Sequence, residues 1–153
     1  MRLRHILSKE IYSIVGLIIA GLAMHLWGAD KVLDTKLYYT VTQAESFFRS
    51  LEASQWQAYL LNEVLDLVFL SNYSLLFFLL ARKFYLKKTW FAFIPGVFDL
   101  IENSTIILLL IYRHSSPPSW LGYVTCMKWL TGAVVVIWII FEFTKASRRG
   151  DKS

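Results

Sequence analysis

The sequence has one cysteine, few charged residues and none of the common catalytic motifs. With Cys126 alone, no disulfide can form within the chain, and no Cys-x-x-Cys pair is present for disulfide chemistry. The sequence also lacks a glycine-rich phosphate loop, His-Glu-x-x-His and Gly-x-Ser-x-Gly. It therefore gives no reason to expect a dithiol oxidoreductase, a P-loop nucleotidase, a zinc protease of that type or an α/β-hydrolase.

The scarcity of charge indicates the class of protein. Charged residues make up 18% of the 153 residues and hydrophobic residues 56%, a composition typical of membrane proteins. Four apolar stretches, expected at about 11–27, 58–81, 90–112 and 120–143, are long enough to cross a hydrocarbon core of about 30 Å. The predicted fold is an all-α membrane protein, a four-helix bundle that forms a single domain over residues 1–153.

Most basic residues fall on one side of these predicted spans. Only Lys31, Lys36, Arg49 and Arg113 lie in the two links on the other side. The positive-inside rule then predicts that both termini are cytoplasmic. The remaining basic residues outside the spans are divided among three short segments beside the membrane, so no basic face suited to nucleic acid is predicted and no nucleic-acid partner is expected.

The first span and the link after it carry three further signals. His25-Leu26-Trp27-Gly28 lacks the small residues of a signal-peptidase site, so we expect an uncleaved span. His25 near its outer end is either an interfacial histidine or a functional one. The segment Thr42–Glu45 has the spacing of a capping box and precedes an apolar stripe. A short amphipathic helix is expected at about 43–52, either as a lid on the bundle or resting on lipid headgroups.

Polar side chains, most of them carboxylates, interrupt two of the predicted spans, and in each span they fall on one helical face. These groups are Asp99, Glu102 and Asn103 in the third span, and Glu63, Asp66 and Tyr73 in the second. A charged side chain in mid-bilayer costs roughly 2.5–3.5 kcal/mol, so such residues predict a functional site. The short link between these spans makes them antiparallel, which brings the two acidic faces together.

Lys128 in the fourth span is the cation expected at the same depth. An unpaired lysine there would be costly, so a partner is predicted among Glu63, Asp66, Asp99 and Glu102. One lysine cannot neutralise four carboxylates. The carboxylates that Lys128 does not neutralise must be protonated, hydrated in an outward-open pocket, or bound to a cation.

Three functions are compatible with this cluster. The favoured one is a pocket between spans two, three and four that binds a small amphiphile or a cation. Its candidate residues are Glu63, Asp66, Tyr73, Asp99, Glu102, Asn103 and Lys128. Acid/base chemistry on a lipid is one version of this hypothesis, so enzymatic activity stays open. The alternatives are a structural subunit or assembly factor of a larger membrane complex, and a proton-coupled carrier, which four spans suit better as a homodimer.

No cofactor is expected, and a divalent metal is a lesser alternative. An all-oxygen set of ligands suits hard cations. The candidate ligands are Glu63, Asp66, Asp99 and Glu102, with His25 as the one nitrogen ligand inside the membrane.

Several short pieces occur in a fixed order along residues 30–110. They are Leu33-Asp34-Thr35-Lys36, Tyr39-Thr40, Ala44 to Leu51, Tyr59 with Asp66, Phe69 and Tyr73, and Pro95 with Asp99-Leu100-Ile101-Glu102-Asn103. This pattern resembles a family of small bacterial four-span membrane proteins of unassigned function. The resemblance implies a bacterial inner membrane and no particular activity. A weaker likeness in fold, to the sterol isomerase/sigma-2 receptor (EXPERA) superfamily, rests on span number, a long first link and an acidic second span.

Overall fold

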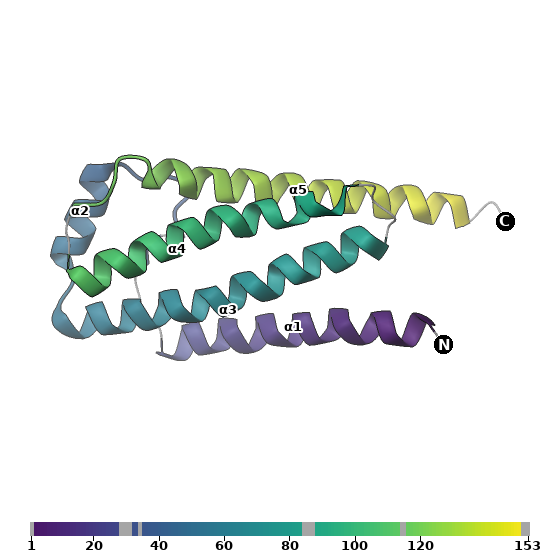
Figure 1. Cartoon of the computed structure of the whole chain (residues 1–153), viewed down its shortest axis with the longest axis horizontal. Helices are drawn as coiled ribbons and strands as arrows, with labels where there is room; N and C mark the ends of the chain where they lie inside the picture. The colour runs from purple at the N-terminus through teal and green to yellow at the C-terminus, as the bar shows by residue number, and fades with distance from the viewer. Residues whose placement is uncertain (1, 28–31, 34, 84–87, 114–115, 151–153) are drawn as a thin grey trace.

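The structure is a computed structural model of the chain that describes residues 2–27, 32–33, 35–83, 88–113 and 116–150 (Figure 1). Its regular elements are α1 (Arg2–Trp27), α2 (Val41–Ser50), α3 (Ala53–Lys83), the 3₁₀ helix η1 (Thr89–Phe93), α4 (Ile94–Tyr112) and α5 (Leu121–Gly150). No strand occurs in these ranges. The all-α prediction is confirmed.

Four of these segments are long and apolar enough to cross a membrane. They are Lys9–Trp27, Ala53–Lys83, Thr89–Tyr112 and Leu121–Lys145. Each overlaps one predicted span, so the chain is an integral membrane protein with four helical spans. The third span opens with η1, and α4 follows with Pro95 in its first turn, where a proline is tolerated since it has no amide hydrogen to donate.

The four spans pack side by side in a row rather than in a closed ring. α1 packs mainly on α3, α3 packs on α4, and α4 packs on α5. Figure 1 shows the two termini at one end of the bundle and α2 lying across the other end. We refer to these as the termini end and the α2 end. The helices α1 and α5 form the two edges of the row.

The amphipathic helix exists, but it begins two residues earlier than the capping-box prediction. Thr40 is the N-cap: its Oγ1 accepts a hydrogen bond from the Gln43 backbone N–H at 3.3 Å, and Gln43 Oε1 accepts one from the Thr40 N–H at 2.9 Å. The prediction that Thr42 caps the helix with Glu45 is therefore wrong. Glutamine serves at the third position as well as glutamate, and packing decides between the two threonines.

That packing makes α2 a lid on the bundle. Starting at Val41 places Ala44 and Phe48 one turn apart, and both are buried against the spans. They belong to one apolar core that also contains Tyr59, Ile106 and Leu121. The helix therefore closes the α2 end rather than resting apart from it on headgroups.

Candidate ligand-binding cavity and its ion-pair network

α4 turns its polar side chains into the bundle. Asp99, Glu102 and Asn103 are all buried, whereas the intervening Leu100 and Ile101 are exposed on the lipid side. The three-to-four-residue spacing of a helix produces this separation. The prediction that these three residues share one face is confirmed.

Lys128 of α5 reaches two of these side chains. Its Nζ lies 3.0 Å from Asp99 Oδ1 and 2.8 Å from Glu102 Oε2. Asp99 also accepts a 2.7 Å hydrogen bond on Oδ2 from the hydroxyl of Tyr73 in α3. The predicted partnership of Lys128 with the carboxylates is confirmed. Buried ion pairs need such additional hydrogen bonds to offset their loss of hydration.

Glu102 also contacts one residue from outside the spans and a second residue of α5. The Tyr39 hydroxyl, which precedes α2, donates to Glu102 Oε1 at 3.3 Å, and the Thr125 hydroxyl donates to the same oxygen. With Lys128 at the second oxygen, the carboxylate is fully buried among three partners. Glu102 thus joins the segment before α2 to α5 through α4.

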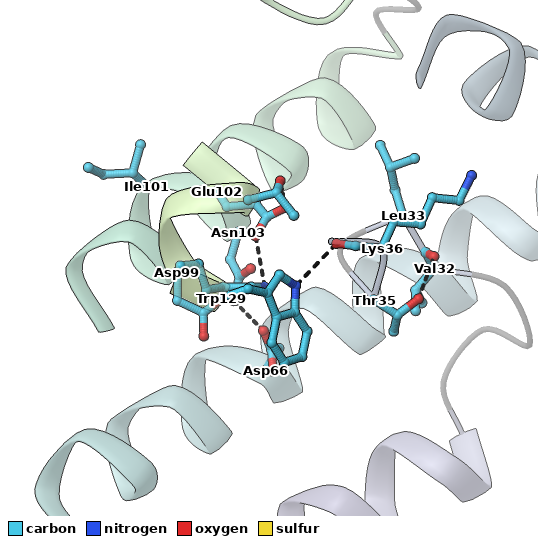
Figure 2. A network of polar contacts seen from close by, with 12 residues as sticks. Val32, Leu33, Thr35, Lys36, Asp66, Asp99, Ile101, Glu102, Asn103 and Trp129 are labelled. Atoms are coloured by element: carbon cyan, nitrogen blue, oxygen red, sulfur yellow. Dashed lines mark hydrogen bonds and ion pairs between the residues drawn. The ribbon is translucent and has the colours of Figure 1, made fainter. Parts of the chain in front are cut away.

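Asp66 of α3 joins the same interior through Asn103. The Asn103 amide donates to Asp66 Oδ2 at 2.5 Å, and Figure 2 shows this bond beside Glu102 and Asp99. The acidic faces of α3 and α4 therefore meet as predicted. Asp66 and Asp99 also line a cavity next to this network.

This cavity has a volume of about 710 Å³, within the range of small-molecule sites. Its polar side chains are Asp66, Tyr73, Asp99 and Lys128, with Thr35 above them at the α2 end. Its remaining wall is apolar and comes from α1, α3, α4 and α5. The expected pocket between spans two, three and four thus also has a wall from span one, formed by Leu17 and Met24.

An apolar stretch of the cavity wall extends along the bundle axis from the charged side chains. From Asp66 the lining of α3 runs to Phe77, and from Lys128 the lining of α5 runs to Ile137. By helical rise these stretches are about 16 Å and about 14 Å long. The charged side chains therefore have a long apolar wall on their termini side.

A hydrogen bond links the segment before α2 to α5 beside the polar groups. Trp129 donates from Nε1 to the Lys36 backbone oxygen at 3.1 Å, as Figure 2 shows. Two residues further along, Tyr38 packs edge-on against Tyr123 with ring centroids 5.5 Å apart. A hydrogen bond with Tyr123 raises the pKa of the Tyr38 phenol. These contacts fix the segment on the start of α5.

The predicted site residues divide into two groups. Asp66, Tyr73, Asp99 and Lys128 line the cavity, whereas Glu63, Glu102 and Asn103 are buried outside its lining. His25 is exposed near the end of α1 and does not line the cavity.

Sequence reasoning missed the roles of Tyr39 and Trp129. Their contacts span 63 and 93 residues of sequence. No periodicity connects a loop tyrosine to one particular carboxylate, although a tryptophan next to an intramembrane lysine is a signal that could have drawn attention to Trp129.

The described part of the chain contains no group of three or more His, Cys, Asp or Glu side chains placed to hold a metal ion. Between Asp99 and Glu102, the place that a cation would take is occupied by the Lys128 ammonium.

The comparisons with known proteins give no relative. No protein-family model, curated protein or solved structure matches this chain. The function must therefore be argued from the cavity itself.

Proposed function

We propose that this protein binds a small amphiphile in the cavity, with the polar end of the ligand at Asp66 and Asp99. The observation that carries the proposal is a cavity inside four membrane spans whose lining combines three charged side chains with a long apolar wall. Charged side chains are rarely kept at membrane depth without a use. An amphiphile matches both parts of the wall at once.

The charge of the wall favours a head group that donates hydrogen bonds. Two carboxylates and one ammonium line the cavity, so the wall is net negative when all three are ionised. The Tyr73 hydroxyl and the Lys128 ammonium both donate to Asp99, which leaves the wall richer in acceptor oxygens than in donors. A protonated amine complements this arrangement, whereas a carboxylate head would add a like charge in a medium of low dielectric constant.

Binding of three dodecyl compounds tests the proposal. The protein in lipid nanodiscs is titrated with dodecylamine, dodecanol and dodecanoate, and binding is read by native mass spectrometry. We expect dodecylamine to bind best and dodecanoate worst. Asp66→Asn should weaken dodecylamine about 10- to 100-fold, because a charge-assisted hydrogen bond contributes about 1.5–3 kcal/mol. Glu52→Gln, an exposed carboxylate between α2 and α3, is the matched control and should bind normally. Failure of all three compounds to bind would refute the proposal.

A structural role is the second candidate, and one observation favours it for part of the network. Glu102 is enclosed by Tyr39, Thr125 and Lys128 and does not line the cavity. Its contacts suit a residue that fixes helix register. If the whole cluster served only this purpose, as in a subunit of a larger complex, Asp66→Asn would leave cellular function intact and no dodecyl compound would bind.

The charge distribution along the bundle supports the proposed orientation. Arg82, Lys83, Lys88 and Lys145 belong to the ends of α3, η1 and α5 that lie near both termini (Figure 1). We propose that this end is cytoplasmic, in a bacterial inner membrane. Labelling of a cysteine placed at the exposed Ser46 by an impermeant maleimide in intact cells, in a Cys126→Ser background, tests this. Labelling only after lysis would reverse the orientation.

A further inference from the structure

We infer that the ligand enters the cavity sideways from the bilayer, between α1 and α5, and that Gly132 keeps room for its apolar chain. This inference rests on the proposed function. It adds the source of the ligand, which is the lipid phase, and a residue that keeps room for the start of the ligand's chain.

The helices α1 and α5 both line the cavity without packing closely on each other. α1 packs mainly on α3 and α5 mainly on α4. The cavity wall nevertheless includes Leu17 and Met24 from α1, and Val136 and Ile137 from α5. We call the region between these four side chains the α1/α5 opening. All four lie within the spans Lys9–Trp27 and Leu121–Lys145, so the opening lies at membrane depth.

Exposure of the lining residues agrees with a lateral opening. At the polar end, Asp66 is 6% exposed and Asp99 4%, whereas Val136 and Ile137 on α5 are 40% and 66% exposed. The apolar part of the cavity is therefore the accessible part. Apolar side chains exposed within a membrane span face lipid rather than water.

The other sides of the cavity are tied together. At the α2 end, Trp129 bonds to the Lys36 oxygen and Tyr39 bonds to Glu102. Between α3 and α4 the backbones approach so closely that a Cβ on Gly96 would collide with Ser74 Oγ. At the termini end, Lys83 of α3 pairs with Glu10 of α1 at 3.2 Å. Entry on any of these sides would require packed helices or bonded segments to separate. Entry through the α1/α5 opening requires no such separation.

Gly132 differs from Gly96, which allows two helices to approach each other closely. A Cβ added at Gly132 would meet only Pro95 Cβ, at 4.0 Å, so no close helix contact requires glycine there. Glycine costs about 1 kcal/mol relative to alanine within a helix. Gly132 lies one turn from Lys128 and lines the cavity. The space that it leaves lies where the chain of an amine bound at Asp66 and Asp99 would begin.

Closing the opening tests the route. Leu17→Cys and Ala133→Cys, in a Cys126→Ser background, place thiols on opposite sides of the opening at similar depths, about 15 Å from Trp27 and about 18 Å from Leu121 by helical rise. After joining with a bifunctional maleimide, we expect uptake and release of dodecylamine to slow about tenfold or more. Each single-cysteine protein treated with the same reagent is a control. Exchange at an unchanged rate in the joined protein would overturn the inference.

A second measurement does not depend on the cross-link. If dodecylamine enters from the bilayer, its binding after addition to the aqueous phase lags behind its partitioning into the nanodisc lipid, and the rate of binding follows its mole fraction in that lipid. Butylamine, which has the same head group and remains in water, should not slow this binding. Binding that precedes partitioning into the lipid, or slowing by butylamine, would show an aqueous route. If no dodecyl compound binds the unmodified protein, the proposed function fails and not the route alone.

Substitutions on α5 test the role of Gly132. Gly132→Leu should weaken binding of dodecylamine and of hexylamine about tenfold or more, because the filled space lies beside the first carbons of either chain. Val134→Leu on the same helix is exposed and does not line the cavity, so it is the matched control. Unchanged binding of both amines to Gly132→Leu would overturn the role given to Gly132.

Discussion

Replacing Lys128 by methionine removes a cation that contacts both Asp99 and Glu102. Its ammonium lies 3.0 Å and 2.8 Å from them, and the side chains are only 11%, 6% and 0% exposed. Removing one partner of a buried pair typically costs about 3–5 kcal/mol, because the remaining charge loses its compensation. We expect Lys128→Met to lower the free energy of unfolding by that amount.

A double-mutant cycle separates this loss from the effect of packing. Glu102→Gln removes the negative charge and keeps a side-chain oxygen that accepts from Tyr39 and Thr125. Lys128→Met combined with Glu102→Gln should therefore lose less stability than the sum of the single changes, by about 1–3 kcal/mol. Reversible unfolding in mixed detergent micelles measures each variant.

The pair Lys145 and Glu142 is the matched control. Its atoms lie 4.0 Å apart and both side chains are partly exposed, at 48% and 24%. Exposed pairs contribute about 0–1 kcal/mol, so Lys145→Met should have little effect. Additivity in the Lys128 and Glu102 cycle, or a loss at Lys128 no larger than at Lys145, would refute the claim that the intramembrane ion pair stabilises the bundle.

Two further substitutions test contacts that join distant parts of the chain. Tyr39→Phe removes the hydroxyl that donates to Glu102 and should cost about 1–3 kcal/mol, whereas Tyr38→Phe should cost less, as unfolding in the same micelles would show. Equal losses for the two would contradict the role given to Tyr39. Gly96→Ala should cost about 1–3 kcal/mol because the new Cβ meets Ser74 Oγ. The same measurement on Gly96→Ala with Ser74→Ala should show most of the stability restored, and no recovery would place the strain elsewhere.

Much of the fold follows from the sequence because the membrane imposes it. Four apolar stretches of sufficient length leave few arrangements other than a helical bundle. Helical periodicity places Asp99, Glu102 and Asn103 on one face, and the short link after α3 makes α3 and α4 antiparallel neighbours. The partnership of Lys128 with acidic residues follows from the cost of an isolated charge in the membrane.

The remaining features depend on how the helices rotate and tilt, which periodicity does not specify. Sequence could not select Asp99 and Glu102 over Glu63 and Asp66 as the partners of Lys128. Two threonines, Thr40 and Thr42, each precede a suitable side chain at the third position, and only the burial of Ala44 and Phe48 decides between them.

The participation of α1 in the cavity was also beyond sequence reasoning. Leu17 and Met24 are ordinary apolar residues of a membrane span, and nothing in their spacing distinguishes the cavity wall from a lipid-facing surface. Their placement depends on the angle between α1 and α5, which is set by packing on α3 and α4.

A crystal structure with 12-bromododecylamine tests the central claim most directly, because the bromine marks the end of the chain by its anomalous scattering. We predict one anomalous peak inside the bundle, near Phe77 and Ile137, with the amine within hydrogen-bond distance of Asp66 or Asp99. A bromine found only on the outer lipid-facing surface, beside residues such as Leu108, would contradict the assignment of this cavity as the binding site.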